Sequence, residues 1–295
     1  MKRDFVSILD WTSEEIRSNL DFAVELKQQT KEGKCPQLLQ RKTFGLFFHK
    51  PSLRTRLSFE VGIAQLGGTA MVLSEQDFKI GERETVSDVA RVMSRYVDGI
   101  LIRTYSHQMV LDLAKYSTVP VVNMLTDFNH PCQVMSDMLT IKEKLGRIDE
   151  VRIAYVGDSN NMTNSWLNIA ARIPLDLRIA TAPETLPDME LVRKIQKIGI
   201  STIKVTHSAE EAVNGVEVLY TDVWASMGEK EKIEERERVL REFQINSSLL
   251  QCAEKEAFVL HCLPAERDKE ITDEVIEGSQ SVVFDQAENR LHAQK

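Results

Sequence analysis

Short apolar runs alternate with segments of helical periodicity along most of the chain. Parallel strands need long crossover connections, which are usually helices, so this alternation predicts a parallel α/β sheet. In such sheets, ligands bind beyond the carboxyl ends of the strands. In the first half, strands are predicted at 43–48, 70–73, 99–102 and 119–124, with helices at 53–66, 85–96 and 107–116.

The alternation starts again after a predicted helix at 131–145, in which Val134, Met138, Ile141 and Leu145 share one apolar face. The sequence therefore predicts two doubly wound α/β domains hinged on this helix, each with a central parallel sheet flanked by helices. The strands of the second domain are predicted at 151–156, 177–181, 202–205, 216–220 and 257–260.

Charge and composition exclude several classes of protein. The net charge is −8 and no long basic run occurs, which argues against nucleic acid and anionic membranes as partners. No run approaches the ~20 apolar residues that a membrane span needs, and no secretory h-region follows the N-terminus. The four cysteines are far apart in the sequence, which disfavours a zinc ribbon or a disulfide framework and favours reduced thiols in a cytoplasm.

The stretch 44–60 reads as an apolar strand, a short loop and a helix. Ser52 stands at the expected N-cap, and Arg54 and Arg56 follow in the first helical turn. Arginines are poor choices there, because the N-terminus of a helix already carries partial positive charge. A solvated surface helix would have acidic residues in this turn, so a bound phosphate-like dianion is the better interpretation.

Further polar residues follow predicted strands. Arg103 could bind the same anion or merely reach solvent, and His130 could donate to a substrate oxygen or cap the helix that begins at Pro131. Gln133 offers both a donor and an acceptor. Asp222 suits an ammonium ligand or an N-cap, and Cys262 could equally be a buried, inert thiol.

The turn at 157–161 has one glycine where a dinucleotide-binding turn has three, which argues against an NAD-dependent oxidoreductase. Its amides, Asn160 and Asn161, are better interpreted as groups that face a cleft.

Five motifs together resemble the aspartate/ornithine carbamoyltransferase family, in order and over essentially the whole chain. The Ser-Met-Gly and His-Cys-Leu-Pro segments are similar to its ornithine branch in particular. The motifs are Ser52-x-Arg-Thr-Arg56, His130-Pro-x-Gln133, Asp222-x-x-x-Ser-Met-Gly228, His261-Cys-Leu-Pro264 and Glu288-Asn-Arg290.

The resemblance implies transfer of the carbamoyl group of carbamoyl phosphate to the side-chain amine of L-ornithine. The products would be L-citrulline and phosphate, either in arginine biosynthesis or in the reverse direction. It implies a carbamoyl phosphate domain at 1–130 joined by a C-terminal helix at 280–295, an interdomain helix at 131–147 and an ornithine domain at 148–279. It also implies a homotrimer, or a multiple of trimers, with shared active sites, and neither metal nor cofactor.

Site residues are carried over from the same resemblance, which gives the catalytic roles to Arg103, His130, Asp222 and Cys262. It assigns carbamoyl phosphate binding to Ser52, Leu53, Arg54, Thr55, Lys79, Arg103, His130, Gln133 and Arg290. It assigns ornithine binding to Asn161, Asp222, Ser226, Met227, Cys262 and Leu263.

Three positions depart from the family pattern, namely Leu53, Lys79 and Glu266. A carboxylate at Glu266, so close to the expected ornithine site, bears on the choice of acceptor. The alternatives are a carbamoyltransferase for another amine, such as putrescine, an N-acylornithine or aspartate, and a non-catalytic homologue that binds a metabolite. A non-catalytic homologue would be expected to lack part of the Ser52–Arg56, Arg103 or 130–133 set, and this chain has all of it.

Overall fold

The computed structural model describes residues 2–74, 80–81, 83–224 and 233–295. The chain forms two compact units, and each is described here by itself. The first unit contains Met1–Leu139 and Glu288–Lys295, and the second contains Thr140–Ala287. Two helices cross this division along the chain, α5 (Pro131–Leu145) and α12 (Val283–Gln294).

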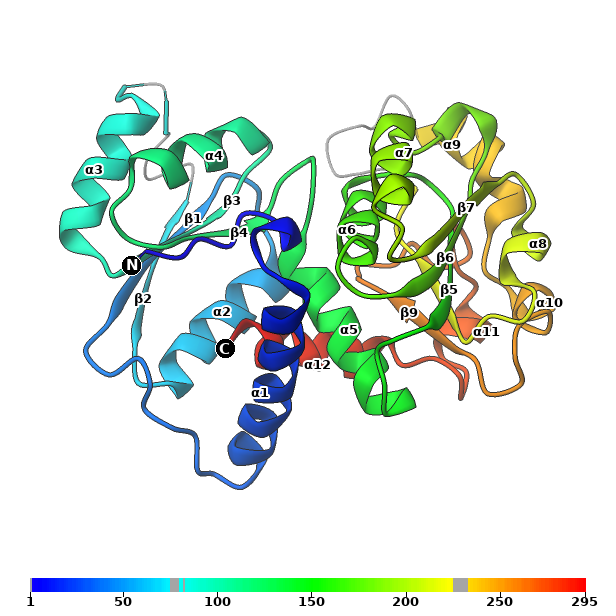
Figure 1. Cartoon of the computed structure of the whole chain (residues 1–295), viewed down its shortest axis with the longest axis horizontal. Coiled ribbons are helices and arrows are strands. Elements are labelled where there is room, and N and C mark those ends of the chain that lie inside the picture. The colour runs from blue at the N-terminus through cyan, green and yellow to red at the C-terminus, as the bar shows by residue number, and fades with distance from the viewer. Residues whose placement is uncertain (1, 75–79, 82, 225–232) are drawn as a thin grey trace. The chain divides into compact units, whose positions relative to one another are not determined.

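The first unit is built on a parallel sheet with the strand order β2-β1-β3-β4 among the described residues (Figure 1). The chain runs outward from β1 to β2, and then returns to β3 on the other side of β1. The elements are a short 3-10 helix (Ile8–Asp10), α1 (Ser13–Lys31), β1 (Thr43–Phe48), α2 (Leu53–Gln65), β2 (Thr69–Ser74), α3 (Val86–Tyr96), β3 (Gly99–Arg103), α4 (His107–Tyr116) and β4 (Val121–Leu125).

Side chains alternate between the two faces of this sheet, and helices cover both faces. Ile100 and Ile102 pack in one cluster with Val89 of α3 and Val110 of α4. Leu101, which lies between the two isoleucines, points to the opposite face, where α1 and α2 contribute to the same apolar lining. Because successive strand side chains point to opposite faces, β3 is covered on both sides, which explains its nearly continuous apolar sequence.

The second unit has a parallel sheet with the order β7-β6-β5-β8-β9 (Figure 1). Here the chain runs outward from β5 to β7 and returns to β8. The elements are β5 (Val151–Val156), α6 (Asn161–Ala170), β6 (Leu175–Ala180), a 3-10 helix (Pro183–Thr185), α7 (Met189–Ile198), β7 (Thr202–Thr206), α8 (Ala209–Val213), β8 (Val218–Thr221), α9 (Ile233–Leu240), a 3-10 helix (Arg241–Phe243), α10 (Ser247–Leu250), β9 (Phe258–His261) and α11 (Asp273–Ile276).

This sheet is also covered on both faces. Tyr155 of β5 stacks on Tyr220 of β8 with ring centroids 5.6 Å apart, and Trp166 of α6 meets Tyr220 edge-on at 5.2 Å. The neighbouring strand residues Ala154 and Leu219 point the other way, into a cluster with residues of α8 and α11. The predicted fold class, two doubly wound α/β units with parallel sheets, is confirmed.

Three local predictions were wrong, each because tertiary context decides burial. The apolar run 70–73 predicts a short buried strand, but the segment is the edge strand β2, where Met71 is 53% exposed. Helical periodicity over 85–96 places Tyr96 on one apolar face with Val89 and Met93, but Tyr96 is 76% exposed. Helix α5 was predicted to bury one face, but it is buried on all sides over 131–141.

Among the described residues, no helix combines the length and the apolar character needed to cross a membrane.

Candidate active site

The loop between β1 and α2 ends in a capped helix start. The hydroxyl of Ser52 accepts from the Thr55 backbone N–H at 3.3 Å and donates to the Thr55 hydroxyl at 3.0 Å. The first turn of α2 has no acidic residue to offset its positive end. Arg54 is partly exposed, and the side chain of Leu53, which is 71% exposed, points to solvent.

Two guanidinium groups meet at the Thr55 hydroxyl. Arg103, at the end of β3, donates through Nη1 to Thr55 Oγ1 at 3.3 Å, and Arg290 of α12 donates through Nη2 to the same oxygen at 3.4 Å. Thr55 is 1% exposed, and both arginine side chains are buried. Two buried cations beside a helix N-terminus make a strongly electropositive site, which suits an anion with several oxygens.

Helix α5 and the residue before it add two buried side chains to this group. Gln133 accepts from Arg290 Nη1 through Oε1 at 2.6 Å. Burial, together with the positive charges of Arg290 and Arg103, holds the pKa of His130 well below its usual value. His130 is therefore neutral at pH 7 and can donate a hydrogen bond without adding charge to the site.

This cluster lies at the topological switch point of the first sheet. β1 leads into Ser52 and Thr55, and β3, its neighbour on the side to which the chain returns, ends in Arg103. Such a reversal leaves a crevice at the carboxyl ends of the two strands, because their connections leave in opposite directions.

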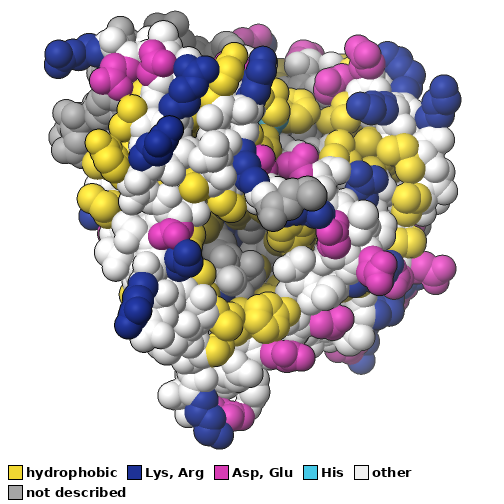
Figure 2. Space-filling model, turned by 60° about the vertical axis from the view of Figure 1, so that its left-hand side comes forward, with side chains coloured by type: hydrophobic (Ala, Val, Ile, Leu, Met, Phe, Trp, Pro, Cys, Tyr) yellow, Lys and Arg dark blue, Asp and Glu magenta, His cyan; other side chains and the backbone are white. Residues whose placement is uncertain are grey.

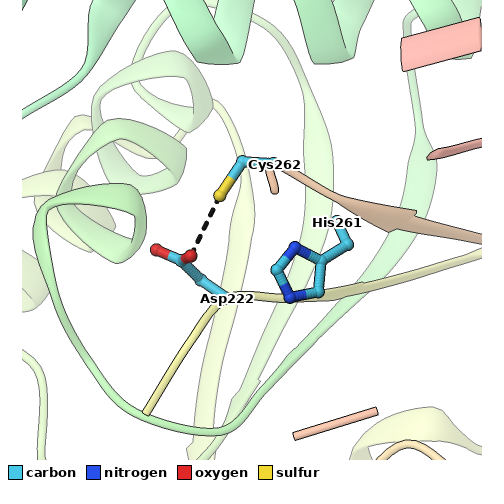
Figure 3. A group of neighbouring side chains, drawn as sticks. All are labelled: Asp222, His261 and Cys262. Atoms are coloured by element: carbon cyan, nitrogen blue, oxygen red, sulfur yellow. Dashed lines mark hydrogen bonds between the residues drawn. The ribbon is translucent and has the colours of Figure 1, made fainter. Parts of the chain in front are cut away.

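The second sheet has its switch point between β5 and β8, and a second polar group follows these strands and β9. Cys262 donates through Sγ to Asp222 Oδ1 at 3.0 Å, and Figure 3 shows the thiol pointing at this carboxylate. Asn160, the N-cap of α6, donates through Nδ2 to Asp222 Oδ2 at 2.9 Å. The backbone N–H of Val223 donates to Oδ1 at 2.8 Å. A carboxylate accepts about four hydrogen bonds, so these three, which come from the described residues, leave room for a further donor.

Tyr155 fixes the orientation of Asn160. Its hydroxyl donates to Asn160 Oδ1 at 3.3 Å and to the Asp158 carbonyl at 3.0 Å. Burial and the neighbouring charge of Asp222 raise the pKa of Tyr155 well above its usual value, so the hydroxyl keeps its proton. The Asn160 oxygen is thereby held toward Tyr155 and its amide NH₂ toward Asp222.

Asp222, His261 and Cys262 have potential metal-ligating atoms within 4.8 Å of one another. Both ring nitrogens of His261 are used within the protein, however. Nδ1 accepts from the Leu263 N–H at 2.9 Å, and Nε2 lies 3.0 Å from the buried carboxylate of Glu270. The imidazole therefore supports the turn at Leu263, and Figure 3 shows its ring apart from the Asp222–Cys262 hydrogen bond.

The structure thus places most of the expected residues in two groups, one in each unit. Asn161 opens α6, beside the Asn160 side chain that reaches Asp222. Sequence reasoning noted both amides but selected only Asn161, because a pattern cannot show which of two neighbours caps a helix. Three expected residues, Lys79, Ser226 and Met227, lie outside the described residues.

Comparison with known proteins identifies the family. The carbamoyl-P binding domain of aspartate/ornithine carbamoyltransferases matches residues 3–143, and the Asp/Orn binding domain matches residues 149–295. The chain is 47% identical over 295 residues to an ornithine carbamoyltransferase of Syntrophus aciditrophicus, covering 100% of this chain and 98% of that protein. It is 48% identical over 293 residues to the chloroplastic ornithine carbamoyltransferase of Pisum sativum, covering 99% and 78%.

A solved structure gives the same result. The ornithine carbamoyltransferase of Pyrococcus furiosus superposes with a TM-score of 0.95 at 46% identity, covering 99% of this chain and 94% of that one. With two domain matches that together span nearly the whole sequence, the chain belongs to the aspartate/ornithine carbamoyltransferase family.

Proposed function

We propose that the protein transfers the carbamoyl group of carbamoyl phosphate to the side-chain amine of L-ornithine, giving L-citrulline and phosphate. The observation that carries this proposal is the buried group formed by Thr55, Arg103, His130, Gln133 and Arg290. It offers two cations and a neutral donor to one small anionic ligand. The relatives named ornithine carbamoyltransferase at 47–48% identity support the choice of reaction.

The first unit binds carbamoyl phosphate. The start of α2 and Arg54 take the phosphate oxygens, because a helix N-terminus and a guanidinium both favour a dianion. Arg103 and His130 donate to the carbamoyl oxygen, where negative charge grows as the amine attacks. A preorganised donor of this kind typically lowers the barrier by ~3–4 kcal/mol.

The second unit binds ornithine. The ornithine amine attacks as a neutral group, and with a pKa of ~10.4 its deprotonation at pH 7 costs roughly 4–5 kcal/mol. Within the described part of the chain, Asp222 accepts from Cys262, Asn160 and Val223, and it orients the amine at the position that these donors leave. The nitrogen then forms a bond to the carbamoyl carbon, and the carbon–oxygen bond to phosphate breaks. The phosphate leaves with the electron pair and takes up the proton that the nitrogen loses.

The acceptor is the point to test first. Glu266 departs from the family pattern, but its carboxylate accepts from Lys269 Nζ at 3.0 Å, which satisfies the charge within the protein. Purified protein should form citrulline from carbamoyl phosphate and ornithine, with putrescine, N-acetylornithine and aspartate tested in parallel. Turnover with another amine alone would refute the assignment of ornithine. Carbamoyl phosphate binding without turnover in any reaction would favour a non-catalytic homologue.

We also propose that the protein forms a homotrimer, or a multiple of trimers. Leu53, Leu57 and Val61 recur every four residues on α2 and are 71%, 51% and 40% exposed, which makes an apolar stripe on one helix. Sedimentation velocity would give the assembly state, and a monomer at micromolar concentration would contradict the proposal.

We further propose a cytoplasmic location, which the four free cysteines support. Basic and acidic side chains are interspersed on the face in Figure 2, with no continuous basic surface among the described residues drawn there. This arrangement suits small-molecule partners better than nucleic acid.

A further inference from the structure

Asp137 is a buried carboxylate that no step of the proposed reaction uses. It lies on α5, four residues after Gln133, and its side chain is 0% exposed. A carboxylate is costly to bury unless hydrogen bonds or charges compensate it. Its Oδ1 accepts from Gln133 Nε2 at 2.8 Å, so part of the compensation comes from a residue of the anion site.

The contacts of Gln133 have a definite direction. On one side its Nε2 donates to Asp137, and on the other its Oε1 accepts from Arg290 Nη1 at 2.6 Å. A carboxylate only accepts and a guanidinium only donates. The carboxamide therefore has one favourable orientation, since a flip would set a donor against Arg290 and an acceptor against Asp137.

Successive hydrogen bonds then connect Asp137 to the anion site through Gln133 and Arg290. Gln133 holds one side of the Arg290 guanidinium, and Nη2 of the same group reaches Thr55 Oγ1 at 3.4 Å. Gln133 and Arg290 are 1% and 3% exposed, so water competes little for these hydrogen bonds.

We propose that Asp137 is a positioning residue for carbamoyl phosphate, which rests on the function proposed above. It fixes the carboxamide of Gln133 so that the oxygen faces Arg290, and it thereby aims this guanidinium at the ligand. Asp137 touches neither substrate. It acts through the orientation of the Gln133 carboxamide on α5, and ornithine binding does not depend on Asp137.

The first test is Asp137→Asn, which keeps the shape but can present an NH₂ as well as an oxygen to Gln133, so it no longer imposes one orientation on the carboxamide. The KM for carbamoyl phosphate should rise about tenfold or more, the range for losing one hydrogen bond to a charged group. The KM for ornithine should stay within about twofold. Cys132→Ala is the matched control, because it removes one buried hydrogen bond of the same helix, from Sγ to the Asn123 carbonyl at 3.3 Å.

A merely structural role would lower the melting temperature and the amount of active enzyme, and would leave both KM values unchanged. That result would overturn the proposal. Equal increases of both KM values would overturn it as well. Wild-type protein that neither binds nor uses carbamoyl phosphate would instead refute the proposed function, and the two failures are therefore distinguishable.

The decisive variant exchanges the two groups, with Gln133→Glu and Asp137→Asn combined. The new amide at 137 can donate to one oxygen of the new carboxylate at 133, whose other oxygen accepts from Arg290. The exchange should bind carbamoyl phosphate at least tenfold more tightly than Gln133→Glu alone. If Asp137→Asn does not fold, the double variant is the test. Recovery of folding and binding supports the positioning role of Asp137, and no recovery refutes it.

Discussion

Thr55→Val removes the hydroxyl at the centre of the anion site and keeps the shape of the side chain. The lost contacts are those from Ser52 Oγ at 3.0 Å, Arg103 Nη1 at 3.3 Å and Arg290 Nη2 at 3.4 Å. The two guanidinium contacts are long for N–H···O hydrogen bonds, so each is taken at ~1 kcal/mol, below the ~1.5–3 kcal/mol of a well-formed hydrogen bond to a charged group. Their sum of ~2 kcal/mol corresponds to about a 30-fold loss.

The assay is steady-state citrulline formation with each substrate varied in turn. We expect the loss of about 30-fold in kcat/KM for carbamoyl phosphate, on the scale of hydrogen bonds to charged groups. The KM for ornithine should remain near the wild-type value, because the groups assigned to ornithine follow β5, β8 and β9 in the second unit.

Thr181→Val is the matched control. Thr181 is also fully buried, and its hydroxyl bonds to the Thr185 hydroxyl at 2.7 Å and to no guanidinium group among its described contacts. Both variants should lose ~1–3 kcal/mol of stability, the usual cost of an unsatisfied buried polar group. If Thr55→Val kept kcat/KM within about twofold of Thr181→Val, the two arginines would not depend on this hydroxyl and the reasoning would fail.

Three further variants test other parts of the site. Arg54→Ala should fold normally and lose turnover by at least ~100-fold, the scale for one preorganised donor, and near-normal turnover would refute its phosphate role. Asp222→Asn should raise the KM for ornithine by ~10-fold or more while carbamoyl phosphate binding, measured by calorimetry, stays unchanged. For His130, burial, Arg290 and Arg103 lower the native pKa, so the unfolded state binds the proton more readily. The contribution of neutral His130 to the free energy of unfolding is therefore present above pH ~6.5. Below that pH it declines by at most ~1.4 kcal/mol per pH unit. Denaturation at pH 7.5 and 5.5 should show this decline in the wild type and a smaller one in His130→Asn.

Much of the fold follows from local sequence. Ser52 and Thr12 cap helices as their types suggest, and the alternation of apolar runs gave the two parallel sheets. Burial was harder to foresee. The polar residues Gln133 and Asp137 are buried because α5 is enclosed on all sides over 131–141, and helical periodicity alone assigns such residues to solvent.

The anion site was predictable in part. Arginines in the first turn of α2 gave a physical reason to expect an anion, and Arg103 followed from its place at the end of a strand. Arg290 could be assigned only through the family resemblance, because no local pattern connects it with Thr55. Asp137 gave no signal in the sequence, since its role depends on the Gln133 carboxamide, which donates to Asp137 and accepts from Arg290.

The contact between Thr55 and Arg290 also determines when, during synthesis, the group around Thr55 can be completed. The two residues are 235 positions apart, and residues 288–295 belong to the same unit as 1–139. At about 5–20 residues per second, a ribosome needs roughly 10–50 s to proceed from one to the other. Throughout that interval the nascent first unit lacks one of the two guanidinium groups that meet at Thr55. The proposed carbamoyl phosphate site is therefore incomplete on a nascent chain, and a message that stops at Ala287 yields a protein without Arg290.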